Sequence, residues 1–297
     1  MKTKPLGKDF LMQQIEGLKR IPTIPAILTP LLNYLQTPAE QLNMQKLTDL
    51  LAQDESLAAQ CLHMANSPLF ARWQRVESLR GAVISLGFHH VRDIALSCCV
   101  LNMLPQRKGP DPVVFWEHSL GCAVVCRRLA REIHLGDPGK AYLAGLFHDL
   151  GIVVNLWIAP QEFEQAFLLA KAESIPLHEA EGKVLGFTHC DSGGLLGQNW
   201  KLPADLIEVM AHHHAVRESA PNPELPALVH IADLLCRMGG LDHGYVEQRQ
   251  VSLFDDPGFA LLARSATLHH YDWARLTFEL DSYLDEVHSL VHAIYRT

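Results

Sequence analysis

The chain has 297 residues, of which 48% are apolar and 20% charged, a composition typical of a soluble globular protein. Acidic residues outnumber basic ones by 33 to 25, and the formal net charge of -8 argues against general binding of nucleic acids or anionic membranes. Uninterrupted apolar runs fall short of the roughly 18 residues that cross a bilayer, and no apolar secretory segment follows the N-terminus. We therefore expect a cytoplasmic protein without a membrane span.

The cysteines give no sign of a functional site, whereas the histidines are unusually many and clustered. The seven cysteines form no CxxC pair, so the sequence predicts neither a disulfide framework nor a thiolate zinc site, and most should be small buried hydrophobic residues. Histidine is abundant, with 17 residues in all. Seven of them lie between His148 and His230, and this clustering calls for an explanation.

Helical periodicity runs through almost every segment, and no hairpin signal appears, so the predicted fold class is all-α. In the first third of the chain, Thr37 and Glu40 form a capping-box pattern that predicts the start of a helix. Further helices should begin near Asp54 and Ser78, and a very apolar helix should cover 91–104.

The stretch PQRKGPDP, residues 105–112, is rich in proline and charge and is the best internal boundary. We divide the chain there into an N-terminal helical lobe, residues 1–107, and a second lobe, residues 108–245. A helical extension, residues 246–297, should complete the chain.

The second lobe should contain at least four helices. They are expected over about 113–133 and 140–157, and from Pro203 and Pro226 onward, with Gly239 ending the last. A terminal helix carries an apolar stripe that favours packing on the chain's own core, although a homodimer seam is the alternative.

His148 and Asp149 lie in the apolar segment AYLAGLFHDLGIVVNLW, which predicts a buried helix. Burying an ionised carboxylate and an imidazole costs several kcal/mol unless a cation or hydrogen bonds compensate. A metal ion is one solution, since nitrogen and carboxylate ligands suit iron, manganese, zinc or magnesium. A buried pair that is only hydrogen bonded is the other.

Further candidate ligands are spaced along the second lobe. His118 should lie on the preceding antiparallel helix, and Asp233 is an isolated carboxylate in the apolar segment VHIADLLC. His189 precedes a glycine pair at a helix start or loop, and the run from His212 to His214 closes a helix. A lone histidine favours a structural role, and a run at a helix C-terminus suits the macrodipole. The spaced set as a whole favours a metal site.

The order His118, His148–Asp149, His189, His213–His214, Asp233 resembles the HD superfamily of metal-dependent phosphohydrolases. Three earlier segments, RIPTIPAILTPLLNYLQ, QDESLAAQCLHMANSPLF and VESLRGAVISLGFHHVRDIAL, resemble the N-terminal part of the HDOD family. FWEHSL, FHDLG, GFTHCDSGGLLGQNWKLP and HIADLL are similar to its C-terminal half, so the resemblance covers roughly residues 8–240. It implies a two-lobed helical bundle with an HD-domain-like C-terminal lobe, cytoplasmic signal transduction in bacteria, and no assured catalysis.

The resemblance also implies ligands. A mononuclear HD site would use His118, His148, Asp149 and Asp233. His189 and His213 could serve a second ion, as in the HD-GYP phosphodiesterases that cleave cyclic di-GMP. The implied cofactor is therefore one or two divalent ions of iron, manganese, magnesium or zinc, and Asp149, His189 and His213 are the candidate catalytic residues.

Departures from the HD-GYP pattern weaken the case for cyclic-dinucleotide cleavage. Ile152 stands where a lysine commonly follows the HD-x-G segment and helps to neutralise a phosphate. The GYP loop is absent, and His243, Gly244 and Tyr245 are interpreted as an accidental echo of it.

These residues and the resemblance leave two candidate functions. The first is an HDOD output or regulatory protein that acts on signalling partners and retains a metal site. The alternative is a metal-dependent phosphohydrolase for a phosphomonoester, nucleotide or cyclic dinucleotide, with Arg127, Arg131 or Lys183 near the phosphate. Nucleic-acid binding ranks last because the chain is acidic.

Overall fold

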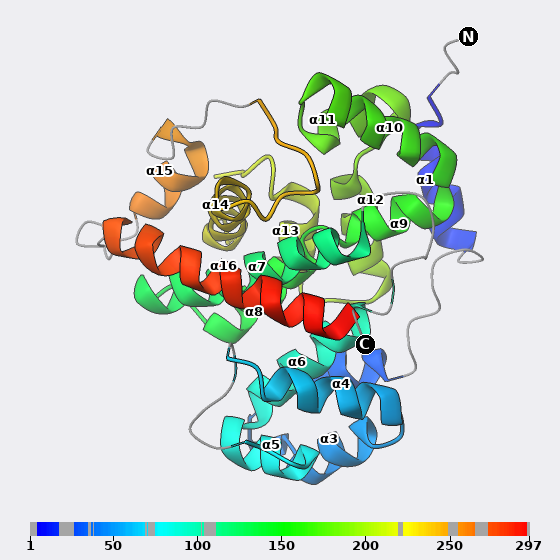
Figure 1. The fold of residues 1–297 in the computed structure, drawn as a ribbon. Coiled ribbons are helices and arrows are strands. Elements are labelled where there is room, and N and C mark those ends of the chain that lie inside the picture. Colours follow the sequence, from blue (N-terminus) through cyan, green and yellow to red (C-terminus); the bar gives the residue numbers. More distant parts are fainter. Residues whose placement is uncertain are drawn as a thin grey trace. The chain divides into compact units, whose positions relative to one another are not determined.

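The computed structural model describes residues 5–17, 27–34, 37, 39–68, 70, 75–101, 103, 111–218, 222–248, 255–264 and 273–295. Every regular element in these ranges is a helix, so the all-α prediction is confirmed (Figure 1). Contacts along the backbone divide the chain into two compact units. The large unit comprises Met1–Pro22 and Pro105–Phe278, and the small unit comprises Thr23–Leu104 and Glu279–Thr297.

The small unit is built mainly from short helices. They are α2 (Leu28–Asn33), the 3₁₀ turn η1 (Ala39–Gln41), α3 (Met44–Leu51), α4 (Glu55–Ala65), α5 (Leu79–Leu86) and α6 (Phe88–Leu101), with the part of α16 (Trp273–Tyr295) that follows Phe278. Asp54 and Ser78 cap α4 and α5 as predicted, because their side chains accept hydrogen bonds from backbone N–H groups in the first turn.

The helix start predicted at Thr37 is wrong. Pro38 lies outside the described residues, and the Thr37 hydroxyl donates back to the carbonyl of Asn33. The next α-helix begins only at Met44, because the Asn43 side chain caps it by accepting from the N–H of Lys46 at 3.0 Å.

The long apolar helix α6 carries one buried charge pair. The Arg92 guanidinium donates to the Asp93 carboxylate from both Nε, at 2.9 Å, and Nη2, at 2.7 Å. Both side chains are at most 6% exposed, so the chain itself supplies the cation that this buried carboxylate requires.

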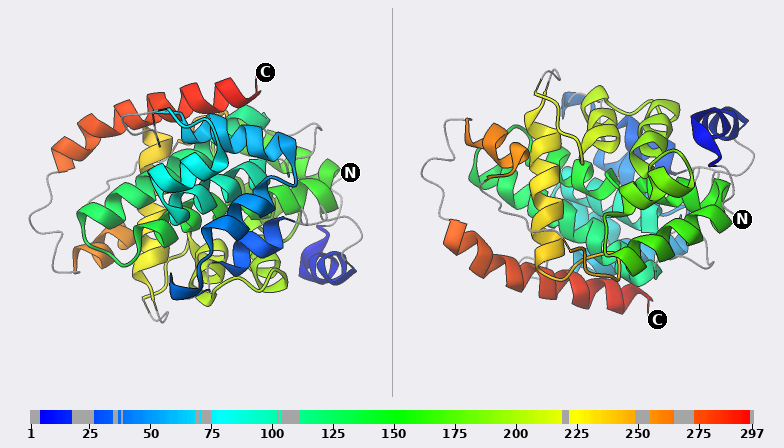
Figure 2. Two further views of the ribbon diagram at one scale, coloured as in Figure 1. Left: turned by 90° about the horizontal axis from the view of Figure 1, so that it is seen from below. Right: turned by 90° about the horizontal axis from the view of Figure 1, so that it is seen from above.

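The large unit holds the remaining helices. They are α1 (Gly7–Gly17), α7 (Pro112–Glu132), α8 (Pro138–Phe147), α9 (Leu150–Ile158), α10 (Pro160–Glu173), α11 (Leu177–Val184), α12 (His189–Asn199), α13 (Ala204–His212), α14 (Glu224–Met238) and α15 (Pro257–Ala263), with the start of α16 (Trp273–Tyr295). Helices α7 and α8 lie side by side, α14 packs on both, and α12 packs on α9 and α13 (Figures 1 and 2). This packing brings the ends of four helices around the middle of α7.

The single helix predicted over 140–157 is interrupted. Helix α8 ends at Phe147 and α9 begins at Leu150, so His148 and Asp149 form the turn between them. The N–H of Ile152 bonds to the carbonyl of Asp149 at 2.9 Å, three residues back, which tightens the chain at this point. The break directs both polar side chains toward α7, α12 and α14.

The whole segment Pro138–Ile158 is long and apolar enough to pass a composition test for a membrane span. However, 94% of its most apolar window is buried inside the structure, as in the core helix of a globular unit.

Other helix boundaries follow the prolines and glycines. Helix α13 follows Pro203 as predicted, and Gly239 caps α14. The start of α14 at Glu224 precedes the predicted Pro226 by two residues, because proline is tolerated anywhere in the first turn.

Two glycines allow helices to approach through their backbones. A Cβ on Gly145 would lie 2.6 Å from the carbonyl oxygen of Cys122 in α7. A Cβ on Gly151 would lie 1.8 Å from the carbonyl oxygen of His189 in α12. Any side chain at Gly151 would therefore separate α9 from α12.

Candidate metal centre

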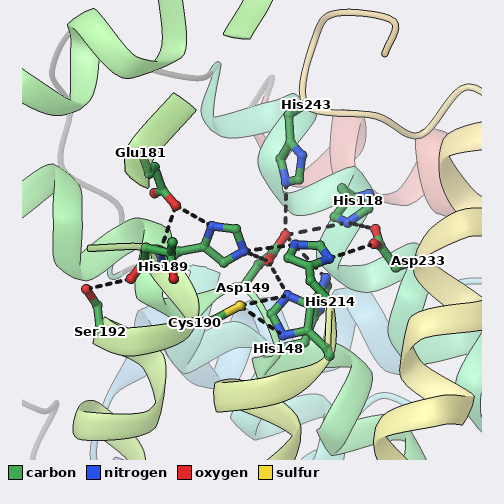
Figure 3. Close-up of polar contacts among 12 residues, drawn as sticks. His118, His148, Asp149, Glu181, His189, Cys190, Ser192, His214, Asp233 and His243 are labelled. Atoms are coloured by element: carbon green, nitrogen blue, oxygen red, sulfur yellow. Dashed lines mark hydrogen bonds and ion pairs between the residues drawn. The ribbon is translucent and has the colours of Figure 1, made fainter. Parts of the chain in front are cut away.

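All six side chains that the sequence predicted as ligands converge in the large unit (Figure 3). They are His118 from α7, His148 and Asp149 from the α8–α9 turn, His189 from the start of α12, His213 from the end of α13, and Asp233 from α14. Each is at most 1% exposed. Their burial together means that no water shell compensates their polar groups.

Asp149 lies at the centre of the group, and its two oxygens face different neighbours. Oδ2 lies 3.0 Å from Nε2 of His243, 3.2 Å from Nε2 of His148 and 3.6 Å from Nε2 of His118. Oδ1 lies 3.4 Å from Nε2 of both His189 and His213. The carboxylate thus divides the histidines into two sets.

We name the two sets by their position around Asp149. The first subsite consists of His118, His148, Asp233 and His243, and the second consists of His189, Cys190, His213 and His214. Asp149 is shared between them.

Asp233 joins the first subsite to an arginine of its own helix. Its Oδ1 lies 3.1 Å from Nε2 of His118 and accepts from Nε of Arg237 at 2.7 Å. Arg237 also pairs with Glu247, so its charge is divided between two acids.

The imidazoles are oriented by their other ring nitrogens. The Nδ1 atoms of His118, His148 and His213 lie 2.7, 2.7 and 3.1 Å from the backbone carbonyls of Leu241, Gly145 and Val209. A carbonyl only accepts, so each Nδ1 carries the proton and donates. In the neutral ring the lone pair is then on Nε2, which faces Asp149. This is the arrangement of metal-binding histidines, whose other nitrogen donates to an anchoring group.

His189 is anchored by a carboxylate rather than a carbonyl. Glu181 is fully buried, and its Oε2 lies 2.7 Å from both Nδ1 and the backbone N–H of His189. Its other oxygen accepts from Asn155 at 2.9 Å, and Asn155 in turn accepts from the hydroxyl of Ser192. This chain fixes the ring at the start of α12 against α9 and α11.

The geometry leaves two central atoms without hydrogen bonds. Nε2 of His148 and Oδ1 of Asp149 are buried and make none with the described part of the chain. Buried polar atoms are rarely left in this state, and both atoms face the space between the histidines. Nitrogen and carboxylate donors aimed at one space fit a divalent transition-metal ion.

Electrostatics favour the ligand forms of Asp149 and His148, whereas Cys122 and Asp233, against the opposing effect of burial, raise the pKa of His118 well above its usual value. Although burial opposes it, the neighbouring His148, His213 and His243 hold the pKa of Asp149 well below its usual range. Burial lowers the pKa of His148, so its ring stays neutral near pH 7. An ionised carboxylate and neutral imidazoles are the forms that bind metal.

In the second subsite, a thiol and an imidazole shift each other's pKa in opposite directions. Against the opposing effect of burial, His213 and His189 lower the pKa of the Cys190 thiol to about 6. Again against burial, Cys190 and Asp149 raise the pKa of His213 to about 10. Without a metal, the protein therefore balances charge here with a thiolate and a protonated imidazole.

Several members of the site were not predicted from the sequence. His243 was interpreted as an accidental echo, yet its ring is in the first subsite, 3.0 Å from Asp149. It lies on the loop after α14, where Gly240 and Gly244 have φ of +87° and +85°. Loop glycines signal a turn but do not show where a side chain points. Glu181, Cys190 and Arg237 were also not predicted to take part.

Asp191, two residues after His189, has a structural role. Its carboxylate accepts from the N–H of Thr188 in a capping box and pairs with Lys8 at 2.7 Å. It starts helix α12 and thereby places His189.

The fold is shared with solved structures. An HDOD domain protein of unknown function from Geobacter sulfurreducens is 29% identical, with a TM-score of 0.83 over 97% of this chain and 98% of that one. A candidate phosphohydrolase from Shewanella amazonensis has a TM-score of 0.74 over 96% and 98% of the two chains, at 20% identity, and shows the fold alone.

Sequence relatives and a family model agree with this fold. An uncharacterized protein of Treponema pallidum is 25% identical over 215 residues, which is 71% of this chain and 41% of that protein. YuxH of Bacillus subtilis is 27% identical over 156 residues, 52% of this chain and 35% of YuxH. The chain thus spans less than half the length of these two relatives. The model of the HDOD domain matches residues 21–216, and the chain belongs to the HDOD domain family.

Proposed function

We propose that this chain is a regulatory HDOD module whose HD-like part holds divalent metal ions in a closed centre and communicates with signalling partners without hydrolysing a substrate. The observation that carries the proposal is the buried convergence of imidazole Nε2 atoms on one ionised carboxylate, Asp149. The proposal has two parts, metal binding and absence of hydrolysis, and different contacts support each.

Metal binding is supported by the anchoring of the rings. Four histidines donate from Nδ1 to fixed acceptors, so their Nε2 atoms are available together at a single place. His118, His148, Asp149 and Asp233 would hold the first ion, and His189 and His213 the second. Imidazole-rich sets of this kind suit iron, zinc or manganese better than magnesium, which prefers oxygen ligands.

A role other than hydrolysis is supported by closure of the first subsite. A phosphoester must reach the ion to react, but the first-subsite side chains and Asp149 are at most 3% exposed. His243 covers Asp149 from the loop after α14. Ile152 is fully buried and uncharged, so its position offers no cation to a phosphate.

The second candidate function is a metal-dependent phosphohydrolase. The shared carboxylate, with nitrogen donors on both sides, favours it, since two ions close together are typical of enzymes that cleave phosphoesters. Such ions would supply an activated water and polarise a phosphoryl oxygen. This function requires His243 and its loop to leave the first subsite, so that a phosphoester can enter.

Elemental analysis of protein purified without chelator tests metal binding. We expect one to two equivalents of transition metal in the wild type and clearly less in Asp149→Ala, because the carboxylate shared by the two subsites is lost. His63→Gln is the matched control, since His63 is an exposed histidine of the small unit and its loss should leave the metal content unchanged. Equal metal in the wild type and Asp149→Ala would disprove the centre.

Phosphatase and phosphodiesterase assays separate the two functions. Metal-loaded protein should release no product from nitrophenyl phosphates, nucleotides or cyclic di-GMP above the level of Asp149→Ala. Turnover that needs metal and disappears in Asp149→Ala would overturn the regulatory proposal in favour of the hydrolase.

A further inference from the structure

A sulfur atom points into the second subsite, and its residue, Cys190, is not fully buried, unlike Cys122 beside the first subsite. Cys190 is the second residue of α12 (Figure 3). Its Sγ lies 3.9 Å from both ring nitrogens of His213. One donor atom each from His189, Cys190, His213 and His214 lie within 4.8 Å of one another.

The spacing of these donors is close to that of a tetrahedral site. Zinc binds imidazole nitrogen at about 2.1 Å and thiolate sulfur at about 2.3 Å, so neighbouring ligand atoms lie roughly 3.4 to 3.8 Å apart. Nε2 of His189 lies 3.1 Å from Nε2 of His214, and Cys190 Sγ lies 3.9 Å from His213. Small shifts would therefore bring all four around one ion.

An independent observation points into the same space. Oδ1 of Asp149 is fully buried, makes no hydrogen bond with the described part of the chain, and faces the Nε2 atoms of His189 and His213. A buried carboxylate oxygen without a donor calls for a cation beside it.

We infer that Cys190 is a thiolate ligand of the second subsite, which binds Zn²⁺ together with His189, His213 and His214. The inference rests on the proposed metal centre but goes beyond it, because it adds Cys190 and His214 as donors and names the ion. On binding, the proton that His213 holds in the metal-free protein passes to solvent, and the thiolate sulfur and the freed imidazole nitrogen bond to the metal. Thiolate and imidazole favour zinc over manganese or magnesium, so the two subsites should differ in the ion they prefer.

Cobalt substitution tests the sulfur ligand by spectroscopy. Metal-depleted protein is titrated with Co²⁺, whose bond to a thiolate gives a near-ultraviolet charge-transfer band. The band should form in the wild type and be absent in Cys190→Ser. Zinc affinity at the second subsite should fall at least about tenfold in that variant, while the first ion stays bound.

Cys122→Ser is the matched control variant. Cys122 Sγ lies 3.6 Å from Nε2 of His118, on the side of the first subsite, and burial holds the pKa of its thiol well above the usual range. This variant should keep the cobalt band. A band that persists in Cys190→Ser or is lost in Cys122→Ser would overturn the assignment.

Alkylation of the wild type gives a readout that requires no substitution. Six of the seven cysteines are buried and Cys190 is the more accessible one. Iodoacetamide should label Cys190 in metal-depleted protein, and Zn²⁺ should protect it, as measured by peptide mass mapping. Labelling that Zn²⁺ leaves unchanged would contradict the inference.

The outcomes also distinguish this inference from the proposed function. Protein that binds two ions without a thiolate band would disprove the sulfur ligand and leave the metal centre intact. Protein that binds no ion at all would disprove both.

Discussion

One carboxylate of each unit, Asp93 in the small unit and Asp149 in the large unit, is buried among different partners. In the small unit, Asp93 receives two hydrogen bonds from the guanidinium of its neighbour Arg92. In the large unit, Asp149 is just as buried, but the groups that face it are five imidazoles. One buried charge has a permanent cation of the chain, and the other has rings that can be neutral.

The difference shows that burial of a charge does not by itself indicate a metal site. A carboxylate beside an arginine has its charge balanced by the chain, and the guanidinium has no lone pair to offer a metal ion. A carboxylate among anchored imidazoles presents several lone pairs to one point, which only a proton or a metal ion can satisfy. The identity of the partners, rather than the depth of burial, separates a structural pair from a candidate binding site.

The largest effect that sharpens this comparison is expected in the small unit. Asp93→Asn should lower the free energy of unfolding by about 3 to 5 kcal/mol, because it leaves the buried Arg92 charge unpaired. Metal content, by elemental analysis, should not change. The double variant Arg92→Met/Asp93→Leu removes both charges and should recover most of the loss in denaturant unfolding. Metal loss in Asp93→Asn would show that the two carboxylates are not independent.

A smaller effect is expected where α9 meets α12. Gly151→Ala should cost about 3 kcal/mol, because its Cβ would overlap the backbone carbonyl of His189. It should also weaken zinc binding, since His189 moves away from Asp149.

Gly182→Ala is the control for that substitution. Gly182 lies in α11 with open space around a new Cβ, so alanine there should be neutral or stabilise the helix by up to about 1 kcal/mol. Denaturant unfolding of both variants measures the change in stability, and zinc titration measures the change in affinity. Equal behaviour of the two would mean that the close approach at Gly151 is not required.

The smallest effect is expected for a third carboxylate, Asp256. Its partners are one imidazole and backbone N–H groups, so it resembles neither Asp93 nor Asp149 fully. Burial opposes it, but the ring of His230, at 3.0 Å, and the N–H of Gly258 hold the pKa of Asp256 below its usual value. A lowered folded-state pKa contributes stability above the unfolded pKa, about 3.9, and the contribution is lost as the pH falls through the folded value.

Wild type should therefore exceed Asp256→Asn in stability by about 1 kcal/mol at pH 7, and the gap should close toward pH 3. Denaturant unfolding at several pH values measures it. A gap that is the same at pH 7 and pH 3 would contradict the role of the charge.

Much of the fold could be predicted from local chemistry. Asp54 and Ser78 are helix caps because their side chains satisfy nearby N–H groups, a contact of only three residues' range. The break at His148 could not be seen, because an uninterrupted apolar pattern continues through it. The close approach of Gly151 to the backbone of His189, just after the break, is a tertiary contact that no local pattern predicts.

Some residues of the candidate site could likewise be predicted from the sequence, and others could not. His118, His148, Asp149 and Asp233 were found because a polar residue in an apolar helix requires a partner. His243 lies in a loop where polarity is ordinary, so no pattern distinguished it. Cys190 could not be recognised from spacing, because its neighbours His213 and His214 are more than twenty residues away in the sequence. The expectation that cysteines contribute no thiolate ligand is the one that our inference revises.

The contact between Gly151 and the backbone of His189 has a consequence for how the chain can change over evolutionary time. Main-chain atoms meet there directly, so no rotamer and no side-chain volume sets the spacing between Asp149 and His189. Substitutions in the surrounding core can alter stability while this spacing stays the same. The ligand geometry should thus tolerate extensive divergence of the core, provided that residue 151 stays glycine.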